Sequence, residues 1–168
     1  EEPYLRTVHG PDYERYTAGT VMLETAERLA TEDKQPALQQ FLLLVGGLRA
    51  MVSRQHTATQ ILDSYLLRSM AVAGYAPSFD HCTRCGEPGP HRWLNPSAGG
   101  VLCTDCRLPG SATPAAETIG VLGALLAGDW PSVESVEPRH LREASGLVAA
   151  YVAWHLERGL RSLAYVER

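Results

Sequence analysis

The chain has 168 residues with a formal net charge of −4, and 45% of its residues are hydrophobic. This composition describes a globular chain and excludes a disordered one. No apolar run approaches the ~20 residues of a membrane span, and no signal peptide is recognisable, so we expect a cytoplasmic protein without a membrane partner. Because the sequence starts at Glu1 instead of Met, we also expect a piece of a longer protein.

The N-terminal part predicts an extended lead-in and two helices. Residues 3–11 read as the lead-in, and the first helix is expected from Asp12 to about Ala30. Its apolar face is predicted to hold Tyr16, Leu23, Ala26 and Ala30. Pro36 suits the first turn of a second helix. The apolar stripe of this helix comprises Phe41, Leu44, Val45, Leu48, Met51 and Val52. Gly46 and Gly47 within it predict either close packing of another helix or a weakened helix.

The third helix has the strongest signals at both ends. Residues 57–60 have the form of a capping box, and Gly74 suits the position just past a helix C-terminus, so we expect a helix from Ala58 to about Ala73. Apolar residues leave it little polar surface: Ile61, Leu62, Tyr65, Leu66, Leu67, Met70 and Val72. We therefore predict that it is the most buried helix.

All four cysteines lie between residues 80 and 108, as the CxxC pairs Cys82/Cys85 and Cys103/Cys106. One CxxC turn lets two thiolates reach a metal ion, and two turns complete a tetrahedron, so the spacing predicts one structural zinc ion. Gly86 follows the first pair, where such a turn tends to need a positive φ. Disulfides, unrelated thiols and a redox CxxC are the alternatives; disulfides would need a secretory context, of which we find no sign.

Proline and glycine are too dense between the cysteine pairs for a helix. We expect short strands at residues 93–94 and 101–102. A segment this short cannot bury a core alone, so a bound metal must supply much of its order.

Two further helices are predicted after the cysteines. The first begins at Pro114 and ends at Gly128, and its apolar stripe comprises Ile119, Leu122, Leu125 and Leu126. A linker is expected from Trp130. The last helix begins at Pro138 and runs to about residue 157, or as far as residue 163. Its inner face comprises Leu141, Ala144, Leu147, Val148, Tyr151, Trp154 and His155.

The predicted fold is mainly α, with about five packed helices and a small inserted zinc-binding β/loop module that carries the four cysteines. We divide the chain into a first half of the helical scaffold (1–79), the zinc module (80–108) and a second half of the scaffold (109–168). The three parts are expected to form one compact unit.

Nothing in the sequence predicts catalysis, and we expect no enzyme. Four thiolates saturate a zinc ion, and no GxSxG, Walker, GxGxxG or HExxH motif is present. His81 and His91 are alternative or supporting ligands at most, and exposed loop histidines are the plainer interpretation. His155 is expected in or beside the core.

The charge of the zinc module argues against DNA binding by this module alone. Its three arginines (84, 92 and 107) balance its three acidic residues (80, 87 and 105). Four thiolates and one Zn²⁺ add −2, so the formal charge of the module is −2. Phosphate contacts need a cationic excess.

The chain as a whole resembles the C-terminal part of the bacterial RecO family of recombination mediators and DNA-annealing proteins. The resemblance rests on residues 13–19, 63–68 and 99–103, and on the CxxCG…GGxxCxxC insert between helical segments. It covers nearly the whole chain. The cysteine pattern alone is shared with many zinc ribbons, but its combination with these helices is specific to the family.

The resemblance implies a partner set and a zinc ion held by Cys82, Cys85, Cys103 and Cys106. Family members have an N-terminal OB-fold domain that supplies much of the binding to single-stranded DNA, and it is expected to be missing here. They work with RecR, bind the acidic C-terminal tail of the single-stranded-DNA-binding protein, anneal strands and load a recombinase, without enzymatic turnover.

An acidic peptide with an aromatic end would fit an apolar groove edged by arginine. Residues 41–79 carry Arg49, Arg54 and Arg68 against Asp63 as the sole acidic residue. These three arginines are our hypothesis for the partner-binding residues. The alternatives to a mediator are a zinc-ribbon transcriptional or DNA-binding regulator, which needs a basic zinc module, and an enzyme with structural zinc, which needs a convergent polar cluster.

Overall fold

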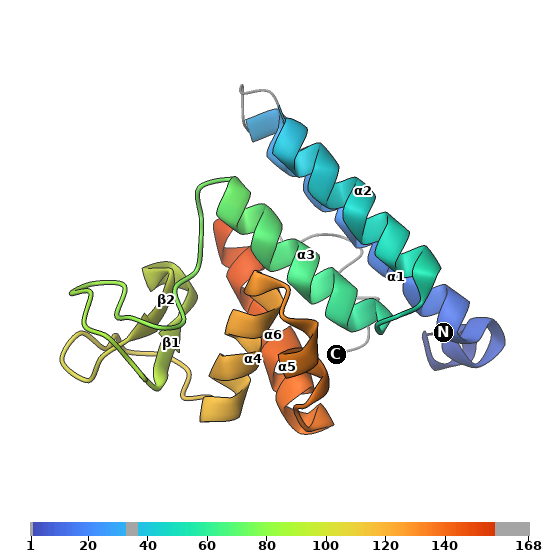
Figure 1. The fold of residues 1–168 in the computed structure, drawn as a ribbon. Coiled ribbons are helices and arrows are strands. Elements are labelled where there is room, and N and C mark those ends of the chain that lie inside the picture. Colours follow the sequence, from blue (N-terminus) through green and yellow to red (C-terminus); the bar gives the residue numbers. More distant parts are fainter. Residues whose placement is uncertain (1, 33–36, 157–168) are drawn as a thin grey trace.

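The computed structural model describes residues 2–32 and 37–156, as a bundle of helices with a small β module at one end (Figure 1). The elements are α1 (Glu2–Glu32), α2 (Leu38–Ser53), α3 (Ala58–Val72), β1 (Trp93–Asn95), β2 (Gly100–Leu102), α4 (Ala116–Ala127), α5 (Trp130–Glu134) and α6 (Pro138–His155). The mainly α fold with an inserted cysteine-bearing module is confirmed. Among the described helices, none combines the length and apolarity required to cross a membrane.

Helix α1 begins at Glu2, so the predicted extended lead-in over residues 3–11 is wrong. The backbone leaves helical geometry only at Gly10, with φ 53° and ψ −144°. Both prolines of this stretch occupy positions that a helix tolerates, since Pro3 lies in the first turn and Pro11 directly follows the break. The amide hydrogen that proline lacks has no intrahelical partner at such positions.

The predicted buried face of α1 is also wrong. Tyr16 is 73% exposed and Leu23 is 52% exposed. The buried stripe comprises Thr17, Ala18, Val21, Met22, Thr25 and Leu29. The two threonines can join this stripe because their hydroxyls bond to the helix's own backbone; Thr25 Oγ1 donates to the Val21 carbonyl at 2.7 Å. Apolar residues lie on both sides of α1, four of them in the buried stripe, and the prediction selected the wrong side.

Helix α2 lies along α1 and α3 at the outside of the bundle (Figure 1). Close packing is confirmed at Gly47, where a Cβ atom would lie 2.1 Å from Cε of Met22, while the space beside Gly46 is open. Only part of the predicted stripe is covered, because Met51 is buried whereas Phe41 and Val52 are exposed. The predicted start at Pro36 lies outside the described residues.

Helix α3 begins and ends as predicted. The Thr57 side chain accepts a hydrogen bond from the Gln60 amide, and the Gln60 side chain accepts one from the Thr57 amide, which completes the capping box. At the other end Gly74 has φ 94°, and the Gly74 and Tyr75 amides donate back to the last turn, as in a Schellman motif. The helix packs against α1, α2, α4 and α6.

Three polar groups of buried α3 residues bond to the neighbouring helices, while the Ser69 hydroxyl has no hydrogen-bond partner among the described residues. Ser64 Oγ donates to the Leu125 carbonyl of α4 at 2.7 Å, and Tyr65 Oη donates to the Met22 carbonyl of α1 at 3.2 Å. The Ser69 carbonyl accepts from Nε2 of Gln40 at 2.9 Å. A buried polar group without such a partner would be costly, so these bonds allow α3 to lie at the centre.

The second half of the scaffold contains one more helix than predicted. The expected linker at Trp130 is the short helix α5, whose first turn is capped by Asp129 through the Ser132 amide and hydroxyl. Helix α4 starts at Ala116, two residues after the predicted Pro114, and ends at Gly128 with φ 73°. Helix α6 starts at Pro138 as predicted, and its proposed extension past residue 156 lies outside the described residues.

Two leucines with opposite exposure test the position of the core. Leu66 of α3 is 0% exposed, and Leu42 of α2 is 58% exposed. We expect Leu66→Ala to lower the free energy of unfolding by about 2–5 kcal/mol through lost burial and a residual cavity. Leu42→Ala is the matched control and should change it by less than about 0.5 kcal/mol. Urea unfolding followed by circular dichroism measures both, and equal effects would contradict this placement of the core.

Candidate metal centre

The β module is a two-faced ribbon. Strands β1 and β2 pair antiparallel with Trp93 opposite Leu102 and Leu94 opposite Val101. Because side chains alternate along a strand, Leu94 and Val101 join the main helical core, while Trp93 and Leu102 pack with Cys82 and Cys103. The predicted strands are confirmed, and one face of the ribbon belongs to the helices while the other carries the thiols.

The first CxxC turn is shaped by backbone hydrogen bonds. The Cys82 amide donates to the Glu87 carbonyl and the Gly86 amide to the Cys82 carbonyl, each at 2.9 Å. Gly86 has φ 76°, which confirms the predicted need for glycine there. The Thr83 amide donates to the Val101 carbonyl at 3.0 Å, so the turn is fixed directly on β2.

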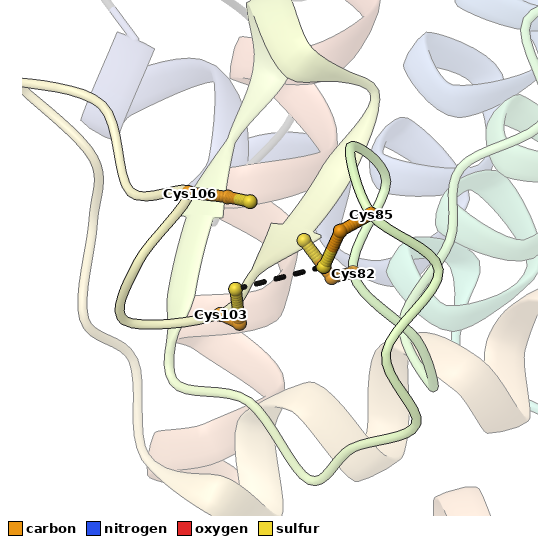
Figure 2. Close-up of side chains that lie close together, drawn as sticks. All are labelled: Cys82, Cys85, Cys103 and Cys106. Carbon is orange, nitrogen blue, oxygen red and sulfur yellow. Dashed lines mark hydrogen bonds between the residues drawn. The ribbon is translucent and has the colours of Figure 1, made fainter.

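The four cysteine side chains point toward one another from two loops (Figure 2). Their sulfur atoms all lie within 4.8 Å of one another, and the Sγ atoms of Cys85 and Cys103 are 3.8 Å apart. In a tetrahedral site with metal–sulfur bonds of about 2.3 Å, neighbouring sulfurs lie about 3.8 Å apart. The cluster could therefore hold one metal ion, and its donor set is compatible with zinc.

The thiols affect one another's ionisation. Burial disfavours the Cys82 thiolate, but backbone amides, chiefly that of Cys103, outweigh it and lower the pKa of Cys82 to about 6. Hydrogen bonding to Cys103 raises the pKa of Cys106 to about 12. The Cys82 thiolate thus forms readily, whereas ionisation of Cys106 is disfavoured. A cation at the centre of the cluster would stabilise all four thiolates.

The histidines do not belong to the cluster. His81 Nδ1 lies 2.6 Å from a carboxylate oxygen of Asp80, and His91 Nε2 lies 2.8 Å from the Glu87 carbonyl. His155 is half-buried on α6 with Nε2 3.2 Å from the Pro96 carbonyl, and burial lowers its pKa. It therefore links α6 to the turn between the strands, in keeping with the boundary position expected for it.

The chain enters and leaves the module through further β pairing. Ser78 pairs with Gly100 on one side of the ribbon, and Ala112 pairs with Leu94 on the other. Gly100 has φ 143°, and a Cβ atom there would lie 2.1 Å from the Ser78 carbonyl oxygen. Only glycine lets the entering chain pass this close to β2.

Two arginines of the module meet at one aromatic ring. The guanidinium carbons of Arg92 and Arg107 lie 5.5 and 5.1 Å from the Trp93 ring centroid. Arg92 adjoins Trp93 in sequence, but Arg107 reaches the ring only because β1 and β2 pair and the second CxxC turn folds back. No local sequence signal predicts that approach.

The three hypothetical partner-binding arginines lie at different places on the helices. Arg54 follows the C-terminus of α2 with φ 57° and is ion-paired with Asp12 at 2.5 Å. Arg68 lies toward the other end of α3, beside Gly128, and Arg49 is exposed on α2. Their role in partner binding stays a prediction.

Comparison with known proteins identifies the family. A family model described as "Recombination protein O C terminal" matches residues 10–164. The chain belongs to the RecO family. It is 69% identical over 162 residues to the DNA repair protein RecO of a Nocardioides species, and 60% identical over 157 residues to that of Streptomyces griseus.

The alignments cover most of this chain but less of these RecO proteins. They take in 95% and 94% of the chain, against 66% of the Nocardioides protein and 63% of the Streptomyces griseus protein. The chain thus spans about two thirds of the length of these relatives.

Gly100 gives a test of how the module is attached. Gly100→Ala should lower the free energy of unfolding by about 3 kcal/mol or more, because the new methyl group meets backbone and φ is unfavourable. Gly120→Ala on α4 is the control, since the space around this exposed glycine is open; it should stabilise by about 0.5–1 kcal/mol. Denaturant unfolding measures the free energy of unfolding of both variants. A Gly100→Ala variant as stable as the wild type would contradict the close contact with Ser78.

The thiol cluster predicts zinc-dependent order that is confined to the module. We expect Cys82→Ser or Cys106→Ser to release zinc and to loosen residues 80–108, while the helices persist because Leu94 and Val101 remain in the main core. Zinc content, limited proteolysis and far-UV circular dichroism measure this. Complete loss of helical signal on chelation would contradict it.

The same cluster predicts that zinc affinity falls as the pH is lowered. Zinc binds thiolates, and the raised pKa of Cys106 means that metal binding must expel a proton there, so affinity should drop between about pH 8 and about pH 6. Competition with a chromogenic chelator measures the change. Affinity that is independent of pH would show that the thiols are already ionised without the metal.

Proposed function

We propose that this chain is the helical, zinc-binding part of a non-enzymatic recombination mediator in DNA repair. It would bind the tail of the single-stranded-DNA-binding protein, RecR and single-stranded DNA, and so promote strand annealing and recombinase loading. The RecO family match over residues 10–164 is the observation that carries this proposal. The whole protein's activity is inferred, since the chain spans about two thirds of its relatives.

Zinc is the proposed metal, in a structural role. A four-thiolate donor set with tetrahedral spacing suits zinc and leaves no open coordination position for a substrate. We further propose the division into residues 1–79, 80–108 and 109–168, and a cytoplasmic location. DNA contact would come mainly from an N-terminal OB-fold domain, as the resemblance implies.

Thr118, His140 and Glu143 form a polar cluster between α4 and α6. Thr118 on α4 bonds to Nδ1 of His140 at 3.1 Å and to a carboxylate oxygen of Glu143, both on α6. A hydroxyl, an imidazole and a carboxylate are the groups of a nucleophilic triad. Thr118 is 0% exposed, however, so no substrate can reach its hydroxyl. The cluster instead fastens α4 to α6.

A chimera tests the proposed function. The matching region of the Nocardioides relative is replaced by this chain, and annealing of complementary strands coated with single-stranded-DNA-binding protein is measured. We expect the chimera to anneal at a rate close to that of the parent relative, since 69% of the aligned residues are identical. A relative that anneals while its correctly folded chimera does not would refute the mediator role of this chain.

The partner-binding arginines are tested in the same background. Replacing Arg49, Arg54 and Arg68 by Ala should weaken binding of a labelled tail peptide by about tenfold or more, because charge-assisted hydrogen bonds to the peptide are lost. Arg84→Ala with Arg139→Ala is the control, on the module and on α6. Unchanged affinity of the triple variant for the tail peptide would refute the role of these three arginines in partner binding. It would not affect the conclusion drawn from the annealing experiment.

A further inference from the structure

The cationic surface of the β module is concentrated at Trp93. Arg92 and Arg107 are both exposed, and both guanidinium groups lie within 5.5 Å of the Trp93 ring centroid. The indole ring attracts each cation and so keeps two like charges close together. An anion with more than one negative group would relieve their mutual repulsion.

The summed charge of the module hides this concentration. With four thiolates and Zn²⁺, the module carries −2 in total; this charge belongs to the metal centre, because the three arginines balance the three carboxylates. Asp80 lies against His81, while neither Arg92 nor Arg107 forms an ion pair within residues 2–32 and 37–156. The two guanidinium groups are therefore available to a ligand.

A mainly apolar pocket of about 300 Å³ adjoins Arg92 and Trp93. It lies between the module and the start of α4, with Arg92, Trp93 and Leu102 on one side and Pro114, Ala116 and Ile119 on the other. This volume is at the lower end of the roughly 300–1,000 Å³ typical of small-ligand pockets. An apolar cavity with a cationic rim suits a flat apolar group that is joined to an anion.

Two further features lie at this place, a buried donor without a partner and a helix N-terminus. Nε1 of Trp93 is buried without a hydrogen-bond partner in the described structure, although a buried indole N–H usually has one. The first turn of α4 borders the pocket, and its N-cap residue Ala115 provides no side-chain cap. The helix N-terminus adds positive potential, which Glu117 in the same turn partly offsets.

We propose that Arg92, Trp93 and Arg107 form a binding site for single-stranded DNA, with phosphates on the two arginines and a base in the adjoining pocket. The proposal rests on the proposed function for the choice of DNA as ligand. Every nucleotide offers a flat base beside a phosphate, and such combinations of aromatic and cationic groups recur in single-strand binding. An acidic peptide provides carboxylates, but no flat apolar group beside each charge.

The metal centre would position this site. Arg107 directly follows Cys106, and Trp93 packs on the same side of the ribbon as Cys82 and Cys103. Closing the second CxxC turn around a metal ion fixes the backbone from which Arg107 reaches the ring. The zinc ion would thus support DNA binding without touching DNA.

Fluorescence anisotropy of labelled oligo(dT) with the zinc-loaded chain, across a salt series, tests the site. Arg92→Gln with Arg107→Gln should lower affinity about tenfold and reduce the slope of log K against log salt by about 1.4, from two lost single-strand phosphate contacts. Arg84→Gln with Arg139→Gln removes the same charge elsewhere and should leave the slope nearly unchanged. Replacing Arg92 and Arg107 by Lys should restore the slope.

Several outcomes would overturn the site. The first is that the zinc-loaded wild type does not bind oligo(dT). The second is that the Arg84/Arg139 control loses as much affinity for oligo(dT) as the Arg92/Arg107 variant, and the third is that an acidic peptide binds through Arg92 and Arg107 while oligo(dT) does not. Zinc content and circular dichroism confirm that each variant is folded. If the chimera fails to anneal strands while the chain still binds oligo(dT) through the two arginines, the mediator role is refuted and this site stands. If the chimera anneals strands while the chain does not bind oligo(dT) through the two arginines, this site is refuted and the mediator role stands.

Discussion

Helix α3 must bury most of its surface while it still carries polar groups, and the rest of the fold meets that requirement. Ser64 and Tyr65 donate to backbone carbonyls of α4 and α1, and the Ser69 carbonyl accepts from Gln40 of α2. Each bond joins α3 to a different helix. The two halves of the scaffold, separated in sequence by the cysteine module, therefore share one core through α3.

The β module depends on that core in a different way. A ribbon of two three-residue strands cannot be stable alone. Its inner face, Leu94 and Val101, is buried with the helices, and its outer face needs the four thiols to be held together. Because Ser78 and Ala112 pair with the ribbon where the chain enters and leaves, the module is attached along its length instead of by a single hinge.

Features set by neighbouring residues were predictable from the sequence. The capping box at Thr57, the glycines at 74, 86 and 128, and the CxxC spacing each require only a few consecutive residues. The buried face of α1 was mistaken because apolar residues lie on both sides of this helix, and because Thr17 and Thr25 are buried with their hydroxyls bonded to their own helix. Helix α5 was missed because five residues are too few for a helical period to show.

The arrangement of arginines at Trp93 could not be predicted from the sequence because it depends on strand register. Arg92 adjoins the ring in sequence, but Arg107 approaches it only once β1 pairs with β2 and the second CxxC turn closes. A net charge of −2 treats all charges of the module as if they were in one place. Binding of an anion depends on local potential, which falls off within a Debye length of about 10 Å, so the position of the two guanidinium groups on one ring matters to a ligand there, as does the metal centre that packs beside the same ring. On the proposal that these arginines bind DNA, the metal centre would have a functional role by fixing where those charges lie.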